Sequence, residues 1–216
     1  MDISRRVALT RGARLEVVTI AWMAVEAVVA LGAGFAARSV LLTAFGVDSI
    51  VELLSGIVLY RRLVQEPGEA AGLVARLEAR TTQISAVLLV LLCAYVVLSS
   101  VAGLALRVIP SASIPGIAIS AIALVAMPLL ARAKHRVNRI LDSPSLRADI
   151  AETVSCAYLA ATTLAGLALA MVTGWWWIQY VAALALLVWL VPETREALEE
   201  RRHNVASQGG KGRNDE

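Results

Sequence analysis

The chain has 216 residues, of which 58% are hydrophobic, and its mean hydropathy is +0.71. A composition this apolar excludes a soluble domain of this size and is typical of a polytopic membrane protein. The net charge of +3 does not indicate nucleic-acid binding, because the basic residues lie in short segments that flank apolar runs. The composition therefore predicts an all-α membrane protein without a large soluble domain.

Six apolar runs approach or exceed the roughly 20 residues that a helix needs to cross a bilayer. The first run follows four arginines, as in a signal peptide, but it is longer than a signal core and carries Glu26 in its middle, so we interpret it as a retained helix. We expect an N-terminal segment at 1–14, a membrane domain at 15–191 and a charged tail at 192–216, whose first part continues as a short surface helix and whose end is disordered. The six spans are expected at about 15–36, 40–60, 82–106, 116–131, 146–174 and 177–191.

Basic residues alternate along the connections between these spans. The N-terminal segment, the second and fourth connections and the tail hold nearly all of the Lys and Arg, whereas Arg38 and Arg107 are single residues in the first and third connections. The positive-inside rule then predicts six spans with both termini in the cytoplasm, in the cell membrane, which is the inner membrane if the protein is bacterial.

Several local features are predicted from turn-forming and interfacial residues. Arg38 marks a short turn, Pro67-Gly68 another, and residues 70–80 a short interfacial helix. His135, among the basic residues 132–139, is interpreted as a solvated surface residue rather than a metal ligand. The remaining features are Asp142 or Ser143 as a helix cap, Trp175 to Trp177 as an aromatic belt, and Pro192 as the end of the sixth span.

The second span carries two carboxylates where apolar residues are expected. Asp48 and Glu52 are four residues apart, so a helix places both on one face, one turn apart. An ionised carboxylate inside a membrane costs roughly 2.5–3.5 kcal/mol, so the pair requires a cation, a proton or a water-filled cavity. Glu26 in the first span either faces the same cavity as Asp48 or lies protonated and hydrogen-bonded in the bundle.

The fifth span carries a second polar group. Asp149, Glu152 and Cys156 are spaced three and four residues apart and share one helical face. If the second and fifth spans pack face to face, Asp48, Glu52, Glu152 and Cys156 converge on one point. Four such ligands suit a tetrahedral divalent cation.

The chemistry of these ligands favours zinc, because a thiolate prefers zinc over magnesium or calcium. The carboxylates without histidine leave manganese, iron and cobalt open. Ligands must lose protons to bind a metal, so a site exposed alternately to the two sides of a membrane would exchange a metal cation for protons.

At these residues the chain resembles the cation diffusion facilitator superfamily. Its second-helix pattern, close to Asp-Ser-x-x-Asp, is matched by Asp48-Ser49-Ile50-Val51-Glu52. Its fifth-helix pattern, close to Ala-Asp-Ala-x-His-x-x-x-Asp, is matched at the start by Ala148-Asp149, and Glu152 and Cys156 keep the spacing of its two ligands. The zinc-binding histidine is absent here. The sequence is similar to the short branch that lacks the C-terminal cytoplasmic metal-binding domain, a branch for which 22–26, 31–34 and 45–56 look typical.

This resemblance implies a homodimeric metal-cation/proton antiporter that exports metal from the cytoplasm. It implies Asp48, Glu52, Glu152 and Cys156 as metal ligands. Asp149 and Glu26 would be accessory metal or proton sites.

Other functions remain open at this point. One alternative is that the carboxylates are structural and hydrogen-bond to neighbouring helices, but two spaced pairs on two spans make a structural role the less favoured interpretation. An organic-cation transporter would need an aromatic-lined cavity, and only 5% of the residues are aromatic. A metal sensor or assembly protein would use the same ligands without transport. We do not expect an enzyme, because no catalytic Ser/His pair, His-rich metal motif or phosphate-binding loop occurs within the spans.

Overall fold

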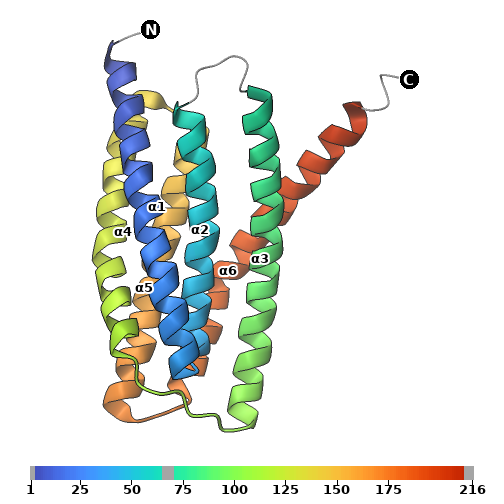
Figure 1. Ribbon diagram of the computed structural model, residues 1–216. Helices are drawn as coiled ribbons and strands as arrows, with labels where there is room; N and C mark the ends of the chain where they lie inside the picture. Colours follow the sequence, from blue (N-terminus) through green and yellow to red (C-terminus); the bar gives the residue numbers. More distant parts are fainter. Residues whose placement is uncertain (1–2, 65–70, 212–216) are drawn as a thin grey trace.

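The computed structural model describes residues 3–64 and 71–211, with the side-chain surroundings of 3–5, 71–83, 85, 144, 193, 197 and 200–211 outside this description. The described residues form six long helices and no strand (Figure 1). The helices are α1 (Ile3–Ala37), α2 (Val40–Val64), α3 (Ala71–Ala105), α4 (Ile114–Leu141), α5 (Pro144–Thr173) and α6 (Ile178–Lys211).

All six helices are long and apolar enough to cross a membrane. They run alternately up and down, so the two ends of the described chain lie toward the same end of the molecule (Figure 1). Long helices satisfy their backbone hydrogen bonds internally, which is what a bilayer demands of a spanning segment. The all-α, six-helix expectation is confirmed, and the chain is a multi-pass membrane protein.

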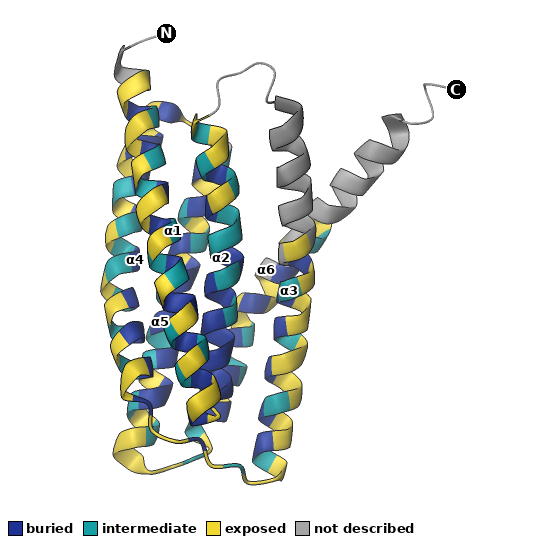
Figure 2. Cartoon of the chain, viewed as in Figure 1, coloured by how far each residue is buried: buried dark blue, intermediate teal, exposed yellow. Residues whose placement is uncertain are grey.

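The second helix, α2, is the central element of the bundle. It packs against α1, α3, α5 and α6. In its apolar stretch 61% of the residues are buried, against 28–35% in the other five helices, whose outer faces are largely exposed (Figure 2). Gly46 allows α1 to approach closely, because a Cβ atom there would lie 2.9 Å from the backbone nitrogen of Leu31. Asp48, Ser49 and Glu52 of α2 are buried.

Several predicted boundaries are wrong. α1 begins at Ile3, so the described part of the expected N-terminal segment 1–14 is helical and continuous with the first span, and α4 continues to Leu141, so the basic residues 132–139 are helical. Residues 71–80 are the first turns of α3 and not a separate interfacial helix. α6 passes through Pro192, since a proline removes one backbone hydrogen bond without preventing helix on either side. The length of an apolar run indicates only the part of a helix that crosses the membrane, and these helices extend beyond their apolar runs.

The connections that the structure describes follow the predicted turns. Arg38 has a φ of 53°, and the Ser39 N–H donates to the Gly34 carbonyl at 2.9 Å, which closes the turn between α1 and α2. Ser143 is the N-cap residue of α5, as expected, and His135 is exposed. The predicted turn at Pro67-Gly68 lies outside the described residues.

Candidate functional site

Glu26 is the point at which α1, α2 and α5 meet through polar contacts. Its side chain is fully buried. The indole N–H of Trp22 donates to Oε2 at 2.7 Å, and the Ser49 hydroxyl donates to Oε1 at 2.7 Å. The Cys156 thiol lies 3.6 Å from the same Oε1. Three neutral donors from three helices thus hold this carboxylate inside the bundle.

The two carboxyls of α2 lie beside this contact. Asp48 and Glu52 are 6% and 5% exposed. The Ser49 hydroxyl, from the same stretch of α2, donates to Glu26, and Oε1 of Glu26 also accepts from the fully buried Cys156 thiol. The Oε1 atom of Glu52 has no hydrogen-bond partner in the described part of the chain. We call Glu26, Asp48, Glu52 and Cys156 the thiol cluster.

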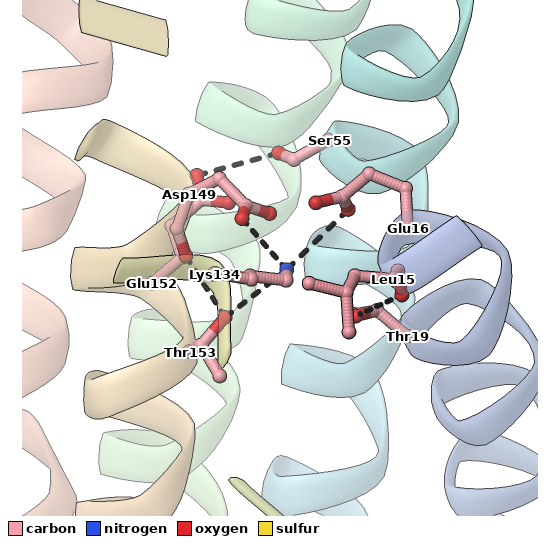
Figure 3. Close-up of polar contacts among 8 residues, drawn as sticks. All are labelled: Leu15, Glu16, Thr19, Ser55, Lys134, Asp149, Glu152 and Thr153. Carbon is pink, nitrogen blue, oxygen red and sulfur yellow. Dashed lines mark hydrogen bonds and ion pairs between the residues drawn. The ribbon is translucent and has the colours of Figure 1, made fainter. Parts of the chain in front are cut away.

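Glu152 of α5 contacts Ser55 of α2. Its Oε1 accepts a hydrogen bond from the Ser55 hydroxyl of α2 at 3.3 Å, and the residue is half-buried (Figure 3). The structure therefore places Cys156 against Glu26, beside the buried Asp48 and Glu52 of α2, and Glu152 against Ser55 of α2, about one turn away from Cys156 along α5. Among the residues that the structure describes, no three or more His, Cys, Asp or Glu side chains are arranged as a preformed metal cage.

A second polar group surrounds Lys134 of α4 (Figure 3). Its Nζ atom lies 2.6 Å from Oδ2 of Asp149 on α5 and 3.3 Å from Oε2 of Glu16 on α1. It also donates to the Thr153 hydroxyl at 3.4 Å. Three oxygen partners match the three N–H donors of an ammonium group. We call Glu16, Lys134 and Asp149 the lysine triad.

The lysine triad is deeply buried. Lys134 and Glu16 are 0% exposed and Asp149 is 5% exposed. Burying charges in a medium of low dielectric constant is costly unless they are paired, and removing one member of a buried pair destabilises strongly. The triad therefore joins α1, α4 and α5 through a charge arrangement that depends on all of its members.

The two groups lie on the same helices. Along α1, Glu16 precedes Glu26 by ten residues, which is about 15 Å of helix. Along α5, Asp149 precedes Cys156 by seven residues, which is about 10 Å of helix. The thiol cluster and the lysine triad thus form one buried polar column along α1 and α5. The triad is nearer the end of the bundle at which α1 begins, because Glu16 precedes Glu26 on this helix.

The sequence analysis missed Glu16 and Lys134. Lys134 was assigned to a basic connection with its arginine neighbours, although helical spacing places it on a stripe with Met127, Ala131 and Asn138, all buried. Glu16 likewise precedes a stripe of buried side chains at Thr19, Met23, Glu26 and Ala30 on α1. For both Lys134 and Glu16, the signal in the sequence was the helical spacing of buried positions, continued into the charged ends of α4 and α1.

No protein-family model matches this chain, and a comparison with curated proteins found no match. The residues of the two buried groups are therefore the basis for a functional assignment.

Proposed function

We propose that the protein transports divalent metal cations across a membrane in exchange for protons, with zinc as the preferred cation. Asp48, Glu52 and Cys156 are its proposed ligands, Glu152 is a fourth, and Glu26 and Asp149 are accessory acids. The metal is the transported substrate and not a resident cofactor.

The observation that carries this proposal is the position of Cys156. A fully buried thiol lies 3.6 Å from the buried carboxyl of Glu26, next to the stretch of α2 that buries Asp48 and Glu52, inside a bundle of six membrane-length helices. Acidic side chains inside a membrane domain typically mark ion or proton pathways. A thiolate with carboxylates is a donor set that suits zinc better than a hard cation.

One distance in the structure supports Glu26 as a metal ligand, whereas its sequence position indicated only an accessory acid. A tetrahedral zinc ion, with bonds of about 2.3 Å to sulfur and about 2.0 Å to oxygen, separates two such ligand atoms by about 3.5 Å. Sγ of Cys156 and Oε1 of Glu26 are 3.6 Å apart. Trp22 and Ser49 hold the Glu26 carboxylate in place, as outer-shell donors orient a metal ligand.

The coupling to protons follows from ligand chemistry. A thiol that donates to Glu26 carries a proton, and that proton must leave before the sulfur can bind a metal. A metal cation and protons therefore compete for the same buried atoms. A bundle that opens the thiol cluster to one side of the membrane at a time would exchange one for the other.

The proposal is tested with the full-length chain in liposomes that contain a pH-sensitive dye. Zinc, manganese, iron(II) or cobalt is added outside, and we expect metal entry to raise the internal pH. Asp48→Asn should abolish this response. Asp142→Asn, at an exposed aspartate outside both buried groups, is the matched control and should keep it.

Two results would oppose this proposal. A wild-type chain that binds metal through Asp48 but moves no protons would be a metal sensor or assembly protein. A chain that neither binds nor moves any of the four metals would have structural carboxyls, and the proposal would be wrong.

A further inference from the structure

The lysine triad holds two carboxyls against one ammonium. The carboxyl oxygens of Glu16 and Asp149 lie 3.3 and 2.6 Å from the same Lys134 nitrogen. Two buried carboxyls this close repel each other when both are ionised, unless a cation or a proton lies between them. The triad is therefore built around a position that attracts positive charge.

The side chains around this position provide oxygen donors. Oδ2 of Asp149, Oε2 of Glu16 and the Thr153 hydroxyl already surround the ammonium (Figure 3). A further carboxylate atom, Oε1 of Glu16, is buried and has no hydrogen-bond partner among the described residues. An oxygen-only set of this kind prefers hard cations such as manganese or magnesium, in contrast to the sulfur of the thiol cluster.

Lysine is the basic side chain that suits a site at which a metal cation replaces the protein's own charge. The chain contains 18 arginines and two lysines, Lys134 and Lys211. The buried basic residue is thus a lysine, although arginine is far more common in this chain. Lysine places a compact point charge on a flexible stem, whereas arginine binds carboxylates as a rigid planar fork. A lysine ammonium therefore leaves two carboxylates more readily than a guanidinium would.

We propose that the lysine triad is a second cation site, occupied in this structure by the tethered ammonium of Lys134, which a metal cation displaces on its way through the bundle. Glu16 precedes Glu26 on α1 and Asp149 precedes Cys156 on α5, so the triad lies between the N-terminal end of the bundle and the thiol cluster, on the polar column that leads to Cys156. The existence of the site does not depend on transport, but its displacement during passage rests on the proposed function.

The first test removes the tethered cation and counts bound metal. Manganese binding to the purified full-length chain in detergent is measured for the wild type, Lys134→Met and the double variant Lys134→Met/Glu16→Gln. We expect Lys134→Met to bind about one additional manganese ion per chain, and the double variant to lose it. Added manganese should also raise the thermal stability of Lys134→Met more than that of the wild type. A folded Lys134→Met chain that binds no additional manganese would overturn the proposal.

The second test uses the wild-type chain, so it stands even if Lys134→Met does not fold. An amine-specific reagent is applied with and without zinc or manganese, and modification of Lys134 is measured by peptide mass spectrometry, with Lys211 as the internal reference. We expect either metal to raise the modification of Lys134 relative to Lys211. Unchanged modification under conditions in which the metal binds would contradict displacement.

The two proposals fail separately. If liposomes show no metal-driven proton movement but Lys134→Met gains manganese, the second cation site stands and transport does not. If transport is present and Lys134→Arg supports it at the wild-type rate, displacement of a tethered ammonium is excluded, because the guanidinium fork would hold the two carboxylates in place.

Discussion

The thiol cluster and the lysine triad bury similar numbers of acidic side chains but hold them differently. In the triad, Lys134 of the chain itself approaches Glu16 and Asp149 to 3.3 and 2.6 Å. In the thiol cluster, neutral indole, hydroxyl and thiol groups contact Glu26. A carboxylate held by neutral donors keeps its attraction for an incoming cation, whereas one paired with an ammonium must first lose it. The thiol cluster can therefore accept a metal cation directly, whereas the lysine triad must exchange its own ammonium for one.

The largest expected effect comes from removing the triad's cation. Lys134→Met should lower the free energy of unfolding by about 3–5 kcal/mol, because it leaves two buried carboxyls without their counter-ion. Denaturation in detergent, followed by circular dichroism without added metal, measures this. The triple variant Lys134→Met/Glu16→Gln/Asp149→Asn removes the charges together and should recover most of the loss. Wild-type stability in Lys134→Met would show that the triad is not a coupled charge group.

A smaller effect is expected where a neutral donor is removed from the thiol cluster. Trp22→Phe deletes the 2.7 Å hydrogen bond to Glu26 and keeps most of the aromatic ring. Losing a hydrogen bond to a charged group costs about 1.5–3 kcal/mol, so the same denaturation assay should show a loss in this range. Trp175→Phe, at an exposed indole, is the matched control. Equal stability of the two variants would mean that the Trp22 contact does not hold Glu26.

The third comparison concerns metal preference. Cys156→Ser should lower zinc affinity at least about tenfold, or about 1.4 kcal/mol, and manganese affinity less, because it replaces a soft ligand by a hydroxyl. Equilibrium binding of both metals to the purified chain measures this. The other cysteine, Cys93, contacts Thr194 at 3.4 Å and lies outside the thiol cluster, so Cys93→Ser should keep the wild-type preference. An equal loss for zinc and manganese in Cys156→Ser would exclude the thiolate as the source of selectivity.

The smallest effect is expected at an ion pair outside both groups. Asp142 and Arg147 are 3.5 Å apart, with side chains 86% and 62% exposed. Exposed pairs contribute little because water and salt screen them, so Asp142→Asn should change the free energy of unfolding by less than about 0.5 kcal/mol. Asparagine also tolerates the positive φ of 47° at this position. A loss comparable to that of Lys134→Met would mean that burial does not distinguish the ion pairs of this chain.

Hydropathy and spacing in the sequence predicted the six helices, the turn at Arg38 and the burial of Asp48, Glu52 and Cys156. These predictions succeeded because membrane crossing fixes the length of an apolar run and helical spacing fixes its faces. The helix ends were misjudged, since polar turns continue α1, α3, α4 and α6 beyond the apolar runs.

The lysine triad was not predicted because charge at the end of a span was interpreted as a topology signal. Lys134 lies between Arg132 and Arg136, both exposed, and nothing in the local composition distinguishes it from them. Its burial depends on partners 118 residues earlier and 15 residues later in the chain, at Glu16 and Asp149. Such partners become visible only when the packing of α1, α4 and α5 is known.

The most direct test of the account is X-ray absorption spectroscopy of zinc bound to the full-length chain. The account predicts a sulfur neighbour at about 2.3 Å with oxygen neighbours at about 2.0 Å. The sulfur signal should be kept in Cys93→Ser and lost in Cys156→Ser. A zinc ion surrounded by oxygen or nitrogen alone in the wild type would contradict Cys156 as the centre of the metal site.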